Sequence, residues 1–259
     1  QQLMLFDNTA DKYFIFKPSR NHIGTPKDLG IDFDDLYFKP APNTTLHGWF
    51  INKGSKQTIL WLHGNGGNIS HRIYSLKNLY DNTKYNIFIF DYRGYGKSNG
   101  NVSESGSYQD SFSAIEFLNT TYSVNSNQLI LFGRSLGSSI ACEIATKITP
   151  LALLLESAFT SIRDMTKFKF PFLPGIKYLI PDKFNTYTKI NQINCPILFV
   201  HGDLDKTIPI KMGVTLYEKY QNTKLFIKAK GAGHNNVEEV LGTNYFKQIE
   251  SFITSNCLK

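Results

Sequence analysis

The sequence has few of the residues that crosslink a chain or hold a metal ion. Only three of its 259 residues are cysteine, Cys142, Cys195 and Cys257, and no two of them form a Cys-x-x-Cys pair. A disulfide framework and a structural zinc site are therefore not expected. We predict ordinary thiols and neither a metal nor a cofactor.

Long apolar runs, internal repeats and flexible linkers are also missing. No run reaches 18 apolar residues, so no segment is expected to cross a membrane. Without linkers or repeats, residues 1–259 are expected to form a single domain. The chain begins at Gln1 rather than Met, and we expect a shortened or processed product whose N-terminal anchor, if it had one, would not be visible. The compartment is not predicted.

Arginine is scarce, although the chain is basic. The formal charge is +7, but only five of the 28 basic residues are arginine, and the lysines are scattered. Nucleic-acid binding requires a clustered basic surface, so no nucleic-acid partner is expected. The lysine excess leaves weak attraction to anionic membranes, and hence peripheral membrane association, open.

Short apolar runs alternate with helical patterns along the chain. The runs read as strands buried on both faces, and lie at residues 58–62, 87–90, 129–132, 151–155, 197–200 and 225–227. The helical patterns lie at residues 71–80, 108–118, 136–147, 210–220 and 237–253. This alternation predicts an α/β fold with a mostly parallel sheet and helices on both faces.

Two segments depart from this alternation. Residues 1–56 are expected to form an N-terminal β-ribbon region, with antiparallel strands at 36–39 and 45–52. Residues 159–190 are longer than one crossover helix and rich in aromatic residues and proline, which favours a lid-like insertion and a packed helical insertion equally. Its candidate acyl-pocket residues are Phe168, Phe172, Leu173, Ile176 and Leu179.

The strongest chemical signal is Gly133-Arg134-Ser135-Leu136-Gly137, which matches G-x-S-x-G. It follows an expected strand and opens an expected helix, the context that a nucleophile elbow requires. The turn is so tight that Ser135 must adopt strained backbone angles, and side chains in place of the two glycines would collide with neighbouring elements. The pattern predicts Ser135 as a nucleophile.

A serine nucleophile needs a base and an acid that orients it, and both follow in the order Ser, acid, His. Asp205 lies on the loop after residues 197–200, and is preferred to Asp203, which is expected to cap the turn. His234 lies between glycines after residues 225–227 and is the preferred base. The other histidines are expected to be surface, packing or structural residues; they are His22, His47, His63, His71 and His201.

Backbone amides are expected to stabilise the oxyanion. One donor is the amide of Leu136, at the start of the helix. The second is assigned to the amide of Asn65 in the glycine-rich loop after residues 58–62, with Gly66 as the alternative. After the next strand, Asp91 and Arg93 either contact substrate or pin their loop through an arginine–carboxylate pair, and we favour the pair.

These residues resemble the Bem46-like serine hydrolases of the α/β-hydrolase superfamily, a group that includes the mammalian ABHD13 and ABHD17 types. The resemblance rests on the segments 63–72, 91–98, 132–137, 156–165, 201–205 and 231–235, in the family's order. It implies an eight-stranded sheet, a triad of Ser135, Asp205 and His234, and hydrolysis of esters or acyl thioesters. Members of the family often carry an N-terminal membrane anchor.

Three functions remain in competition. The favoured one is an acyl hydrolase that forms an acyl-enzyme on Ser135 from a small or lipid-like ester or thioester. A serine peptidase acting on short peptides needs the same residues. A non-catalytic scaffold is less favoured, because such proteins usually lose triad members, and all three candidates are present here. The oligomeric state is not predicted.

Overall fold

The computed structural model describes residues 15–172 and 181–258. The chain divides into two compact units, residues 1–130 and residues 131–259. Strands and helices alternate in each unit, as expected. The single domain expected from the sequence stays a prediction.

The first unit contains four strands of an α/β sheet in the order β4-β6-β3-β2. Their bounds are β2 Asp34–Ala41, β3 Thr44–Ile51, β4 Thr58–Leu62 and β6 Asn86–Phe90. Strand β3 pairs antiparallel with both β2 and β6, whereas β4 and β6 are parallel. The predicted antiparallel ribbon is therefore confirmed. Every residue of β4 and β6 is buried, which explains their near-continuous apolar sequences.

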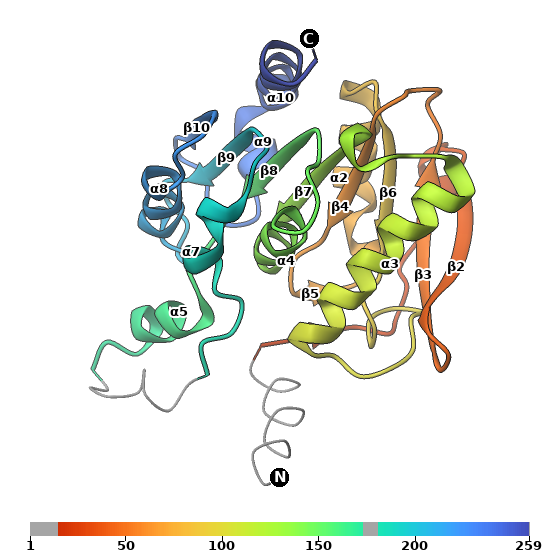
Figure 1. The fold of residues 1–259 in the computed structure, drawn as a ribbon, viewed down its shortest axis with the longest axis horizontal. Helices are drawn as coiled ribbons and strands as arrows, with labels where there is room; N and C mark the ends of the chain where they lie inside the picture. The colour runs from red at the N-terminus through yellow and green to blue at the C-terminus, as the bar shows by residue number, and fades with distance from the viewer. Residues whose placement is uncertain (1–14, 173–180, 259) are drawn as a thin grey trace, which may run out of the picture. The chain divides into compact units, whose positions relative to one another are not determined.

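Two helices lie on opposite faces of these strands, with α3 in front of them and α2 behind them in Figure 1. Helix α2 (Ile73–Asn82) buries Ile73, Leu76 and Leu79. Helix α3 (Glu104–Tyr122) begins four residues before the predicted helix, because the Ser103 side chain accepts a hydrogen bond from the Gly106 amide and caps the first turn. Shorter elements complete the unit: β1 Lys17–Pro18, η1 Pro26–Leu29, β5 Gly66–Gly67, η2 Ile69–Arg72 and η3 Ser126–Gln128.

The second unit contains the strands in the order β10-β9-β8-β7. Their bounds are β7 Leu129–Arg134, which begins two residues before the division, β8 Ala152–Glu156, β9 Ile197–Gly202 and β10 Lys224–Ala229. Strand β9 pairs in parallel with both β8 and β10. Apart from the two-residue strands β1 and β5, the described residues thus contain the eight strands that the resemblance implies.

The helices of the second unit depart from the sequence prediction at one place. Helices α4 (Leu136–Ala145) and α8 (Ile210–Lys219) occur where they were predicted and pack on β8 and β9 respectively. The single helix predicted over residues 237–253 is wrong. Gly242 has φ 57° and ψ −143° and separates α9 (Val237–Leu241) from α10 (Thr243–Asn256). Glycine adopts this positive φ without the penalty that a side chain brings.

The insertion expected over residues 159–190 contains short helices joined by irregular segments where it is described. It contains α5 Ile162–Lys169, α7 Thr186–Lys189 and the start of η4 Ile190–Gln192. Its returning part is tied to α4, because the Ser139 hydroxyl donates to the Phe184 carbonyl at 2.9 Å and accepts from the Thr186 hydroxyl at 2.9 Å. Within the described ranges, no helix combines the length and apolar composition that a bilayer span requires.

The burial pattern predicts a large difference between two isoleucines of the first unit. Ile89 on β6 is fully buried, whereas Ile23 is 57% exposed. Ile89→Ala is expected to lower the free energy of unfolding by about 2–5 kcal/mol, since it leaves a cavity. Ile23→Ala, the matched control, should change it by less than about 0.5 kcal/mol. Urea denaturation measures both, and equal losses would contradict this assignment of the core.

Candidate active site

Ser135 lies at the turn between β7 and α4, in the second unit. Its φ of 54° and ψ of −119° belong to a region that non-glycine residues rarely adopt. The turn is held because the Ser135 amide donates to the Glu156 carbonyl at 2.9 Å, while the Ser135 carbonyl accepts from the Ser138 hydroxyl at 2.6 Å. The expected strained elbow is therefore present.

Gly133 is required at this turn for a steric reason. A Cβ atom at position 133 would lie 2.5 Å from the Gly137 carbonyl oxygen and 2.6 Å from the Ser138 Cα. Both are backbone atoms that cannot rotate away. The helix can therefore pack close behind the strand only if residue 133 has no side chain.

His234 connects the serine to a carboxylate. Its Nε2 lies 3.1 Å from Ser135 Oγ, and its Nδ1 lies 2.7 Å from Asp205 Oδ2. Because a carboxylate only accepts, the proton of this second contact belongs to Nδ1. Nε2 then has a free lone pair directed at the serine hydroxyl, which is the arrangement that a general base needs.

Asp205 is held in its ionised form. Burial alone would raise its pKa, but His201, whose Nε2 lies 3.5 Å from Oδ2, and the hydrogen bond from His234 outweigh burial and lower the pKa well below the ordinary value. Its other oxygen, Oδ1, accepts from the amides of Thr207 and Ile208, both at 2.8 Å. A carboxylate with this many donors remains charged and fixed in orientation.

The competing aspartate has a different role. Asp203 Oδ1 accepts from the Gly231 amide at 2.7 Å and so holds the loops after β9 and β10 together. His201 also stabilises the loop after β9, because its Nε2 donates to the Ile208 carbonyl at 2.9 Å. Asp205, the aspartate preferred from the sequence, is therefore the one that contacts His234.

The three side chains meet because the parallel strands of this unit end at one edge. Gly202, the last residue of β9, pairs with Ala229, the last residue of β10. A Cβ atom at position 202 would lie 2.4 Å from the Ala232 carbonyl oxygen, so glycine lets the loop that carries His234 approach the end of β9. Active sites of open α/β sheets lie at this edge.

Arg134 is a residue whose role the sequence did not reveal. Its Nε lies 2.9 Å from Glu156 Oε1, and its guanidinium donates to the His234 carbonyl at 3.2 Å. Glu156 also accepts from the Tyr245 hydroxyl at 2.6 Å, and burial raises the pKa of that tyrosine well above its ordinary value. Arg134 thus connects the elbow to the histidine loop. Arg134 occupies the x position before the serine in G-x-S-x-G, where the motif allows any residue, so the sequence alone did not indicate this role.

The two predicted oxyanion donors lie in different units. The Leu136 amide begins α4, and no hydrogen bond within the described residues uses it. Asn65 belongs to the first unit, where its Oδ1 accepts from the Lys17 amide at 2.8 Å and from the Tyr95 hydroxyl at 3.2 Å. The assignment of the Asn65 amide, with Gly66 as its alternative, stays a prediction.

The predicted acyl-pocket residues are only partly described. Phe168 is 47% exposed and Phe172 is 71% exposed, so neither side chain is enclosed. Leu173, Ile176 and Leu179 lie outside the described residues.

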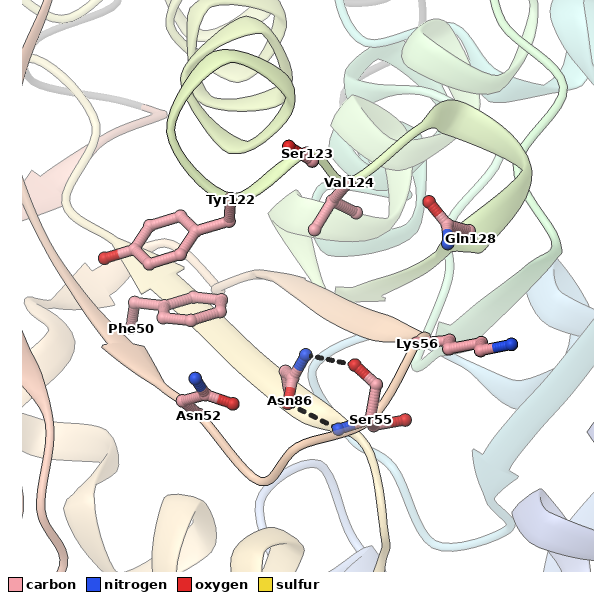
Figure 2. A pocket seen from close by; sticks show the side chains of 9 residues that line it. All are labelled: Phe50, Asn52, Ser55, Lys56, Asn86, Tyr122, Ser123, Val124 and Gln128. Atoms are coloured by element: carbon pink, nitrogen blue, oxygen red, sulfur yellow. Dashed lines mark hydrogen bonds between the residues drawn. The ribbon is translucent and has the colours of Figure 1, made fainter.

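One pocket of the first unit is drawn in Figure 2. Asn86 and Lys56 on its wall lie at or just before the first residues of β6 and β4. The pocket therefore lies at the amino ends of these parallel strands, whereas α/β sheets bind substrates at the carboxyl ends. We assign it no catalytic role.

The loop after β6 differs from the prediction. Arg93 forms the expected arginine–carboxylate pair, but its partner is Asp110 on α3, at 2.7 Å, and not Asp91. Asp91 lies instead among His22, His47 and His63, which were expected to be surface, packing or structural residues. His63 does hold its loop, because its Nδ1 donates to the Gly64 carbonyl at 2.7 Å.

Comparisons with known proteins agree with this fold and identify a family. The sequence profile of the family described as "Serine aminopeptidase, S33" matches residues 53–183. Protein bem46 of Schizosaccharomyces pombe is 30% identical, and the match covers 92% of this chain and 82% of that protein. Alpha/beta hydrolase domain-containing protein 17C of Mus musculus is 30% identical, with 86% of this chain and 69% of that protein covered.

A solved structure extends the agreement to the fold. The esterase Pf2001 of Pyrococcus furiosus superposes with a TM-score of 0.77 at 22% identity, over 93% of this chain and 99% of that one. With the family profile and the relatives, this shows the fold and the family predicted from the sequence. The chain belongs to the Bem46-like hydrolases of the α/β-hydrolase superfamily.

Proposed function

We propose that the chain is a serine hydrolase that cleaves carboxylic esters or acyl thioesters through an acyl-enzyme intermediate. One observation carries the proposal: a continuous chain of contacts from Ser135 Oγ to His234 at 3.1 Å and from His234 to Asp205 at 2.7 Å. A serine hydroxyl becomes an effective nucleophile only with such a base and orienting acid.

In the proposed reaction, Ser135 Oγ attacks the acyl carbon while its proton moves to His234 Nε2. Asp205 accepts the hydrogen bond from Nδ1 and stabilises the imidazolium that forms. The Leu136 amide donates to the oxyanion. The tetrahedral species then expels the alcohol or thiol, which takes the proton from His234, and leaves the acyl group on Ser135. Water attacks the acyl-enzyme by the same steps and releases the acid.

A serine peptidase is the second candidate. It is favoured by the description of the matching family profile, "Serine aminopeptidase, S33". The same three residues would serve, but the leaving group would be an amine that must be protonated as the C–N bond breaks. The choice between these activities rests on the substrate pocket, whose predicted residues lie partly outside the described chain.

A panel of substrates tests the proposal. We expect hydrolysis of p-nitrophenyl esters or acyl thioesters with a higher kcat/KM than that of aminoacyl amides. Ser135→Ala should lower kcat by about 10⁴-fold or more, because no acyl-enzyme can form. Ser251→Ala replaces an exposed serine on α10 and should leave kcat unchanged. Faster cleavage of the amides would favour the peptidase, and an undiminished rate in Ser135→Ala would refute both.

The two aspartates of the loop after β9 provide a matched pair. Asp205→Asn should lower kcat by about 10⁴-fold, because an amide no longer fixes the histidine tautomer. Asp203→Asn removes a negative charge that faces Lys228 at 3.7 Å but keeps an oxygen that can accept from the Gly231 amide, so its kcat should fall far less. Steady-state kinetics at fixed pH measures both. Equal losses in the two variants would show that Asp205 has no special role.

The ionised state of Asp205 also predicts a dependence of stability on pH. Its pKa is lower in the folded protein than the unfolded value of about 3.9, so the carboxylate stabilises the fold above that pH and loses this effect as the pH falls. The difference in free energy of unfolding between the wild type and Asp205→Asn should therefore shrink from about pH 7 to about pH 3. Urea denaturation at several pH values measures this difference, and a constant value would contradict the ionised state.

A further inference from the structure

Asp91 in the first unit is a buried carboxylate with an incomplete set of partners. It follows β6 directly, and its side chain has no exposed surface. Oδ1 accepts from the Ile69 amide at 2.9 Å, but Oδ2 is buried and has no hydrogen bond within the described residues. A buried charge of this kind is unfavourable unless an opposite charge compensates it.

Two histidines face the free oxygen. His22 Nε2 lies 3.4 Å from Asp91 Oδ2, and His47 Nδ1 lies 3.8 Å from the same atom. Neither nitrogen has a hydrogen-bond partner among the described residues, and both are buried. The cluster therefore holds three convergent donor atoms, two nitrogens and one oxygen, all within 4.8 Å of one another.

The tautomer of His47 makes this a site for a cation. Its Nε2 lies 2.6 Å from Asp35 Oδ1, and because a carboxylate only accepts, Nε2 carries the proton. In the neutral ring, Nδ1 then presents a lone pair toward the lone pairs of Asp91 Oδ2. Two lone pairs that face each other repel unless a positive charge lies between them. A carboxylate behind a histidine is also the usual outer contact of a metal-bound imidazole.

We propose that His22, His47 and Asp91 form a binding site for a divalent transition-metal cation, with Zn²⁺ as the representative ion. In a tetrahedral site, zinc–nitrogen and zinc–oxygen bonds of about 2.0–2.2 Å place two donors roughly 3.3–3.6 Å apart. His22 Nε2 and Asp91 Oδ2, at 3.4 Å, already have this spacing. The widest pair of donors, which lies within 4.8 Å, would have to approach by about 1.5 Å at most. Two imidazoles and a carboxylate suit zinc and its neighbours better than magnesium or calcium, which prefer oxygen ligands.

The backbone around the three ligands is already fixed. The residues that flank His22 are held, since the Asn21 carbonyl accepts from the Asn68 side chain at 2.8 Å and the Ile23 amide donates to Ser70 Oγ at 2.9 Å. The His47 carbonyl accepts from the Asp91 amide at 2.8 Å, which holds those two ligands side by side. A site held in this way loses little freedom when an ion binds.

His22 marks the route by which an ion would enter. Its side chain is 14% exposed, whereas those of His47 and Asp91 have no exposed surface, so an ion would reach the buried nitrogens by a small movement of the His22 ring. Asp35 already faces a cation, because Lys97 Nζ lies 3.8 Å from its Oδ2, whereas the free oxygen of Asp91 faces only imidazole nitrogens, so a bound cation would compensate Asp91. The ion would join three segments of the first unit: the chain around His22, strand β3 and the end of β6.

Zinc titration of the chelator-treated protein tests the proposal by isothermal calorimetry. The wild type should bind one equivalent of Zn²⁺ and melt at a higher temperature when it is bound. His22→Gln, which alters the most exposed of the three ligands, should lose this equivalent. Asp35→Asn should retain the ligands but bind about 10–100-fold more weakly. These readouts do not involve hydrolysis, so they are independent of the proposed function.

Two controls locate the ion. His71→Gln changes an exposed histidine of the same unit, and His234→Gln removes the histidine of the candidate active site; both should keep the equivalent of Zn²⁺. Anomalous X-ray scattering from zinc-loaded wild-type crystals should place the ion between His22, His47 and Asp91, which also decides the case if His22→Gln does not fold. No stoichiometric binding, binding unchanged in His22→Gln, or an ion located elsewhere would overturn the proposal. In that case, a proton on His22 or His47 would compensate the negative charge of Asp91.

Discussion

The candidate site depends on a backbone turn that a serine adopts only under constraint. A non-glycine residue in such a conformation costs about 1–3 kcal/mol, which the surrounding structure must offset. Around Ser135 that structure is specific: Gly133 lets α4 pack against the end of β7, and the Glu156 carbonyl accepts from the Ser135 amide at 2.9 Å. The strain exposes the hydroxyl at the strand end and leaves the Leu136 amide without a partner among the described residues, so that one turn supplies both a nucleophile and an oxyanion donor.

The remaining groups of the site are held by contacts that do not touch a substrate. Asp205 is fixed by two backbone amides before it contacts His234. Arg134 bridges Glu156 and the His234 carbonyl, so the elbow and the histidine loop share one guanidinium. In the first unit, Asp91 shows the opposite situation: its Oδ2 faces two imidazole nitrogens without a hydrogen bond, which is why a cation is proposed there and not near Ser135.

The features that were predicted correctly from the sequence are those that depend on neighbouring residues along the chain. The six strands, the G-x-S-x-G turn and the preference for Asp205 all follow from residues close together along the chain, and the structure places these elements where they were expected. The predicted burial is wrong for β10, where Leu225 is 43% exposed. It could not predict contacts that only the tertiary fold creates. His22, His47 and Asp91 are separated by 25 and 44 residues and form no spacing motif, so two histidines were taken for surface or packing residues. The break at Gly242 was missed because an apolar helical pattern continues across it.

The central claim is that the contact between His234 and Ser135 makes that hydroxyl reactive. Labelling of the folded protein with a fluorophosphonate probe, followed by mass mapping of the modified peptide, tests it most directly. We expect one adduct per chain on Ser135, and we expect it to be lost in His234→Ala and in protein unfolded before the probe is added. An adduct on another residue, or none in folded protein, would contradict it.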